Sequence, residues 1–163
     1  MTYQSFLDSA SQSITYGYGK FANPTPQAGN SQLTIGSWTD SIITQSTNTL
    51  VIPQGYQVQL MASFYTERLV GTTGSNFCNM RWYDETNGVY FGMQSTVDCQ
   101  WAVTSPPNVC CNAALAFVDT SAGSITVSCK MSSFSATTTT NISGQRFFSY
   151  GSQSWLTAIT SPV

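Results

Sequence analysis

The 163 residues of the chain fit one domain with a core of its own, and only 7% of them are charged. The net charge is −2, the five Lys and Arg residues are scattered, and no apolar run approaches the roughly 20 residues that span a bilayer, which argues against nucleic acid and membrane as partners. Histidine is absent, so the commonest general base and metal ligand are missing, and we predict a protein that is not an enzyme, binds no metal and needs no cofactor.

The first 30 residues differ in composition from the rest of the chain. The stretch SITYGYGKFANPTPQAGN mixes Gly, Pro, Asn and Gln with Tyr16, Tyr18 and Phe21. Aromatic residues in such an extension cannot build a core of their own, so they either lie on the surface of the domain or dock onto a partner. We predict an irregular, extended N-terminal arm over residues 1–30, with these three residues as docking candidates, followed by one β domain over residues 31–163.

Apolar residues in the rest of the chain recur with a period of two, and turn signals follow at short intervals, which is typical of an all-β protein. NTLVIP (48–53) and GYQVQLMASFY (55–65) are predicted to form a hairpin whose turn contains Pro and Gly. One face of 55–65 is apolar throughout. The other face places Met61 and Tyr65 among glutamine and serine, which makes it too apolar for open solvent and too polar for a core.

A second hairpin is predicted from FCNMRWY (77–83) and GVYFGMQS (88–95), because Asn87-Gly88 favours the positive φ angles of a tight turn. Asp84 and Glu85 lie in its connection and are the strongest candidates for acid–base chemistry. Adjacent carboxylates point to opposite faces of a strand or outward from a turn, so they do not close on a substrate from two sides. We predict that they only keep the tip soluble, and that replacing both by Ala leaves folding almost intact.

A third hairpin is predicted from CNAALAFVD (111–119) and GSITVSCKM (123–131), and SWLTAIT (154–160) forms the last strand. The five cysteines show neither CxxC spacing nor a histidine to complete a zinc site. Cys78 and Cys129 alternate with apolar residues and are predicted to be free thiols in the core. If a disulfide is present, it joins Cys99 to Cys110 or to Cys111, because a bridge between adjacent residues is strained.

The order of these segments resembles the trimeric jelly rolls of the tumour-necrosis-factor and complement globular-head superfamily, including its small bacteriophage versions, over roughly residues 48–160. The stretches that carry the resemblance are TLVIPQGYQVQLMASFY, CNMRWYDETNGVYFG, FVDTSAGSITVSC and SWLTAI. The resemblance implies a ten-stranded jelly-roll β-sandwich of two sheets. The inner sheet, built partly from 55–65, 111–118 and 154–160, packs around a threefold axis, and the second hairpin belongs to the outer sheet.

A homotrimer implies a partly wet contact between copies of the chain. Met61 and Tyr65 are predicted to line this contact, together with Gln59 and Trp155. Animal signalling functions do not carry over, because the N-terminal arm replaces the stalks of animal members.

The resemblance and the composition together favour a virion structural protein that decorates or cements a capsid, or forms a head fibre, with the major capsid protein of a virus as its second partner. Met1 begins a polar stretch without the features of a secretory signal, which agrees with assembly into virions in the host cytoplasm. The alternative is a carbohydrate- or receptor-binding jelly-roll module, in which Trp38, Tyr90 and Trp101 stack on sugar rings.

Overall fold

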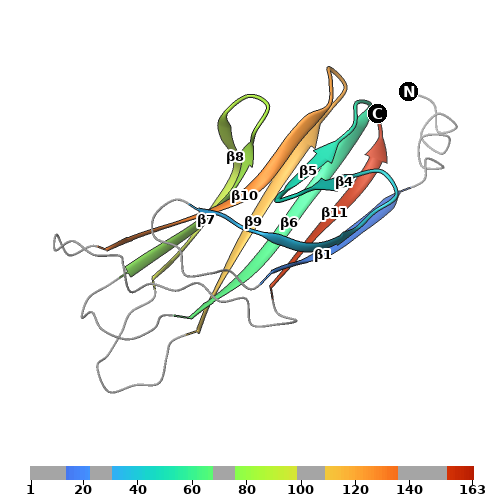
Figure 1. The fold of residues 1–163 in the computed structure, drawn as a ribbon. Coiled ribbons are helices and arrows are strands. Elements are labelled where there is room, and N and C mark those ends of the chain that lie inside the picture. The colour runs from blue at the N-terminus through green and yellow to red at the C-terminus, as the bar shows by residue number, and fades with distance from the viewer. Residues whose placement is uncertain (1–13, 23–30, 68–75, 99–108, 136–153) are drawn as a thin grey trace, which may run out of the picture.

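The period-two segments form eleven β-strands in a computed structural model that describes residues 14–22, 31–67, 76–98, 109–135 and 154–163 (Figure 1). The strands are β1 (Thr15–Phe21), β2 (Ser31–Gln32), β3 (Ile35–Thr39), β4 (Thr44–Ser46), β5 (Thr49–Ile52), β6 (Tyr56–Glu67), β7 (Asn76–Asp84), β8 (Val89–Asp98), β9 (Val109–Asp119), β10 (Ile125–Ser135) and β11 (Trp155–Pro162). No helix long and apolar enough to cross a membrane occurs within these ranges.

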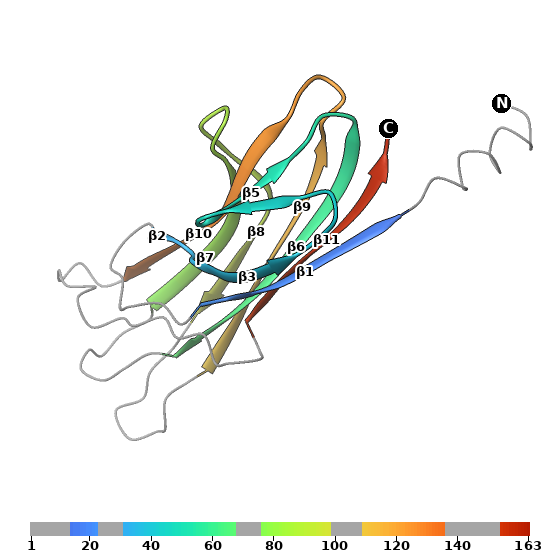
Figure 2. The same ribbon diagram turned by 45° about the vertical axis from the view of Figure 1, so that its right-hand side comes forward.

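The strands pair antiparallel in two layers of five. The first sheet has the order β3-β1-β11-β6-β9, and the second has the order β8-β7-β10-β5-β4. The two sheets are joined by a single residue pair, Met93 of β8 opposite Leu115 of β9. The short β2 pairs with β10 and lies outside this strand order. Figure 2 shows β1, β11 and β6 of the first sheet running side by side. The predicted jelly-roll β-sandwich is confirmed, with β2 added to the ten strands of the main path.

The core lies between the two sheets and follows the period-two pattern strand by strand. In β6, Val58, Leu60 and Ala62 are at most 2% exposed, while Gln57, Gln59 and Met61, which alternate with them, lie on the opposite face of the strand and are more exposed. Trp82, on the second sheet, is the largest fully buried side chain among the described residues. Cys129 is buried there as a free thiol, as predicted, and burial raises its pKa. The side chains of the other four cysteines lie outside the described residues.

Two of the three predicted hairpins are wrong. β5 pairs with β4 and β10 rather than with β6, and β9 pairs with β6 and β8 rather than with β10. The turn between β5 and β6 and the turn between β9 and β10 instead carry the chain from one sheet to the other. Thr120, in the second turn, forms hydrogen bonds to the first. Its hydroxyl accepts a hydrogen bond from the Tyr56 N–H and donates one to the Pro53 carbonyl at 2.7 Å. Local turn signals cannot distinguish such a crossing from a hairpin.

The predicted boundary of the N-terminal arm also needs correction, because residues 15–21 form β1 between β11 and β3. Gly17 and Gly19 of this strand point inward, where a Cβ at Gly17 would collide with the Trp38 ring and with Asp40. The glycines that suggested an irregular arm therefore allow close packing in a regular strand. Phe21 is 3% exposed and packs edge-on against Phe64 with ring centroids 5.5 Å apart, so it is a core residue and not a docking residue.

The β7–β8 hairpin is the predicted one that the structure confirms, and Gly88 has the expected positive φ, of 72°. Its tip differs from the prediction, because Asp84 is 8% exposed and does not face solvent. The Asp84 carboxylate accepts hydrogen bonds from the N–H groups of Thr86 and Asn87 at 2.8 and 3.0 Å, and from Nδ2 of Asn87 at 2.7 Å. Asp84 therefore holds the turn in place from within.

Glu85 has a structural role as well. Its Oε1 accepts a hydrogen bond from the Ser128 hydroxyl at 2.6 Å and lies 3.0 Å from Nζ of Lys130. Partial burial by itself raises the pKa of Glu85, but the Ser128 hydrogen bond and the Lys130 ion pair outweigh it, and the net pKa is lowered. The two carboxylates are occupied by the turn and by β10, which leaves no acid–base pair at this tip.

The lowered pKa of Glu85 predicts how this contact depends on pH. A group whose pKa is lower in the folded state stabilises the fold above its unfolded pKa, here near the usual 4.5, and this contribution is lost as pH falls through the folded pKa. The difference in unfolding free energy between the natural chain and Glu85→Gln should therefore be largest near neutral pH and shrink below about pH 4.5. Urea unfolding of both chains across this range measures it, and a difference that stays constant would contradict the prediction.

Candidate interaction face

The outward side of β1, β11, β6 and β9 carries large apolar side chains with polar ones between them, and we call this surface the apolar face. Strand register places its residues in rows across the sheet. One row is Tyr16, Ile159, Gln59 and Phe117, the next is Tyr18, Thr157, Met61 and Leu115, and the third is Lys20, Trp155, Ser63 and Ala113.

Four aromatic rings of this face are strongly exposed. Phe117 is 69% exposed, Tyr18 66%, Tyr16 65% and Trp155 42%. They come from three different strands. The half-buried Met61 lies in the second row, between the row of Phe117 and the row of Trp155. Exposed aromatic rings gathered on one sheet are uncommon on soluble monomers, so this face is the candidate interaction surface.

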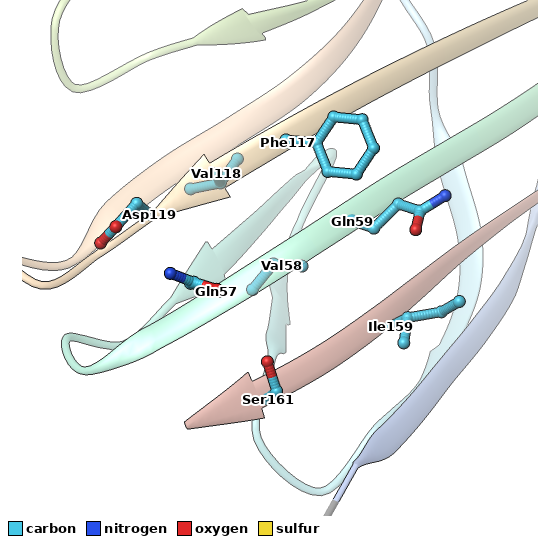
Figure 3. Close-up of a pocket in the computed structure, with 8 residues that line it drawn as sticks. All are labelled: Gln57, Val58, Gln59, Phe117, Val118, Asp119, Ile159 and Ser161. Atoms are coloured by element: carbon cyan, nitrogen blue, oxygen red, sulfur yellow. The ribbon is translucent and has the colours of Figure 1, made fainter. Parts of the chain in front are cut away.

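A shallow groove runs across the apolar face between β9, β6 and β11. Figure 3 shows it with the Phe117 ring on one side, Ile159 on the other and Gln59 between them, and with Gln57 and Ser161 further along. Nε2 of Gln59 lies 3.6 Å from the sulfur of Met61, so the glutamine amide is directed along the sheet. The groove therefore combines an apolar rim with amide and hydroxyl groups that can exchange hydrogen bonds with a partner.

Charges are confined to the ends of the apolar face. Lys20 lies at one end, in the same row as Trp155, and Asp119 lies at the other end, opposite Gln57. The backbone N–H of Ser121 donates to Asp119 at 2.8 Å, and hydrogen bonds from Ser121 and Gln57 lower the pKa of this carboxyl. The centre of the face holds no acidic or basic side chain among the described residues, so a partner can cover it without burying a charge.

The outward side of the second sheet is different in character. Its polar and charged side chains include Asn79, Arg81, Ser128, Lys130 and Ser132. Its large exposed apolar residues, Val89, Tyr90 and Met93, all lie on β8. Large exposed apolar side chains therefore come from three strands of the first sheet but from one strand, β8, of the second.

Three of the four residues predicted at a trimer contact, Gln59, Met61 and Trp155, lie on the apolar face. The side chain of the fourth, Tyr65, is outside the described residues. Tyr16 and Tyr18, predicted as arm residues that dock on a capsid, lie on the same face, because β1 is part of the sheet.

Leu115 and Phe117 also belong to the apolar face but were not predicted from the sequence. The alternation in CNAALAFVD places Ala113, Leu115 and Phe117 opposite the buried Ala114, Ala116 and Val118, and that signal could have found them. Among the residues suggested to stack on sugars, Trp38 is partly buried and donates its Nε1–H to the Ile43 carbonyl. Tyr90 lies on the second sheet, and Trp101 is outside the described residues. No group of three His, Cys, Asp or Glu side chains that could hold a metal occurs in the described part of the chain.

The two sheets and their strand order define a jelly-roll β-sandwich. A crystal structure of murine APRIL at pH 5.0 is similar to it, with a TM-score of 0.55 and 8% sequence identity, over 90% of this chain and 98% of that one. A second crystal structure of murine APRIL, at pH 8.5, gives a TM-score of 0.47 at the same identity and coverage. At this identity the similarity establishes the fold alone. No protein-family model and no curated protein sequence matches the chain.

Proposed function

We propose that this chain is a virion structural protein, a homotrimer that decorates or cements a capsid, and that its copies contact one another through the apolar face. The observation that carries the trimer is the set of four exposed aromatic rings on the outward side of the first sheet. The large exposed apolar residues of the second sheet are confined to one strand, β8, beside the charged and polar side chains of β7 and β10. The rings belong to a sheet of the fold that the resemblance places around a threefold axis.

The apolar face suits a second copy of the chain better than an unrelated partner of high charge. Its charges lie only at its ends, and its centre offers a groove beside the protruding ring of Phe117. In a ring of three, each subunit presents a protruding part to one neighbour and a receiving part to the other. Burying one such ring fully is worth about 1.5–3 kcal/mol, and a trimer has three equivalent contacts.

The oligomeric state tests this part directly. We expect the purified full chain to have a molar mass in solution of three times its 17.7 kDa, measured by sedimentation equilibrium or by light scattering after size-exclusion chromatography. The mass should persist at high salt, because the centre of the contact contains no ion pair. A chain that stays monomeric at all concentrations would overturn the proposed trimer.

The virion part has its own test. The genome that encodes the chain should also encode a major capsid protein, and the purified trimer should sediment with shells assembled from that protein. Because β1 starts at Thr15, an arm truncation should remove residues 1–13 and not 1–30, so that the sheet stays whole. We expect the truncated trimer to lose shell binding. Shell binding unchanged by truncation would overturn the docking role of the arm, and absence of binding by the full chain would overturn the capsid role.

A further inference from the structure

The outward side of the second sheet contains a small hollow where β7, β8 and β10 lie next to one another. Its polar lining consists of Asn79, Arg81, Tyr90, Gln94, Lys130 and Ser132. Two of the five cationic side chains of the whole chain thus line one hollow. Arg81 and Lys130 are direct neighbours across the β7–β10 pair, an arrangement in which like charges repel.

The two cations differ in their partners. Lys130 is neutralised, because its Nζ lies 3.0 Å from Glu85 and 3.2 Å from the centre of the Tyr83 ring. Arg81 has no such partner, since no described carboxylate pairs with it and its Nε is buried without a hydrogen bond. An anionic ligand that approaches the terminal nitrogens of the guanidinium would neutralise this charge and accept charge-assisted hydrogen bonds from it.

The side chains around Arg81 are arranged to bind more than a simple ion. Gln94 donates to the Thr96 hydroxyl at 3.3 Å, and Thr96 donates to Oδ1 of Asn79 at 2.7 Å. Since Oδ1 of Asn79 is thereby occupied, its Nδ2 is left as a donor next to the guanidinium. Tyr90, 43% exposed, packs edge-on against Tyr83 with centroids 4.8 Å apart, which fixes an aromatic ring at the rim of the hollow.

The geometry points to a binding site in which Arg81 holds the carboxylate of a sugar acid while Tyr90 and Asn79 contact its ring. The planar guanidinium matches a carboxylate with two parallel hydrogen bonds, and amide, hydroxyl and aromatic groups together are suited to a polar ring. The hollow, about 140 Å³, is smaller than the roughly 300–1,000 Å³ of most ligand pockets, so it takes one terminal sugar and not a chain of them. This site lies on the surface opposite the apolar face, where it stays accessible in the proposed trimer.

The Arg81 side chain itself can report binding. The chain has three arginines, Arg68, Arg81 and Arg146, so a ¹⁵N-labelled full chain gives three Nε–H resonances, and Arg81→Gln identifies one of them. Titration with D-glucuronate should shift the Arg81 resonance to saturation, whereas D-glucose should not shift it. Acetate should bind about tenfold or more weakly, because it lacks the ring. The absence of a saturable shift with glucuronate would overturn the site, and acetate binding as tightly as glucuronate would overturn the sugar part.

Two further variants separate the site from general folding effects. Asn79→Asp places a carboxylate beside Arg81 that competes with the ligand, and it should weaken glucuronate binding about tenfold or more while the Arg81 resonance remains observable. Tyr90→Ala should weaken glucuronate but not acetate. Circular dichroism and molar mass of each variant should match those of the natural chain. Glucuronate binding unchanged in Asn79→Asp would overturn the assignment to this hollow.

Discussion

Phe117→Asp is expected to convert the trimer into folded monomers. Phe117 is 69% exposed in the single chain, so the substitution should change the stability of the monomer by no more than about 0.5 kcal/mol. In the proposed trimer the same position is covered by a neighbouring copy, and a carboxylate there loses its hydration without gaining a partner. Three equivalent positions add up around the axis, so the association constant should fall at least about 100-fold, or about 2.8 kcal/mol. Sedimentation velocity over a range of concentrations measures this change.

Val89→Asp is the matched control for this experiment. Val89 is also an exposed apolar residue, at 51%, but it begins β8 beside the hairpin tip and does not belong to the apolar face. The same apolar-to-acid change there should leave the trimer intact. Equal dissociation by both variants, or a trimer that persists in Phe117→Asp, would show that the copies do not meet through the apolar face.

Asp84→Ala is expected to destabilise the fold by about 2–3 kcal/mol, because three donors at the tip of the β7–β8 hairpin lose a buried charged acceptor. This corrects the sequence-based expectation that Asp84 is dispensable for folding. The midpoint of thermal unfolding should fall by about 5–10 °C, as followed by circular dichroism. The trimer should survive below that temperature, since the hairpin belongs to the second sheet.

Asp119→Ala supplies the comparison for this prediction. Asp119 also accepts from a backbone N–H two residues later, but it is exposed, so water replaces the lost hydrogen bond at little cost. Its effect on stability should stay within about 0.5 kcal/mol. Equal effects of the two substitutions would mean that burial of Asp84 does not decide its contribution.

The sequence by itself determined the fold class and the two faces of most strands. Alternation in segments such as 55–65 follows directly from the pleat of a strand, so it requires no knowledge of partners. The same reasoning identified Met61 as outward-facing yet too apolar for free solvent. The turn at Gly88 was predictable too, because its chemistry is local.

Apart from the β7–β8 hairpin, only the tertiary structure decided which strands pair, because most of the other pairs join residues far apart in the chain and leave no local signal. In β1, for example, the glycines suggested a loop from the sequence, whereas in the structure they make room for the ring of Trp38. The sequence suggested that Asp84 is exposed to solvent, whereas in the structure its carboxylate accepts hydrogen bonds from the backbone of the turn. The apolar face arises in the same way, since Tyr18, Trp155 and Phe117 come from three separate segments that only the assembled sheet brings together.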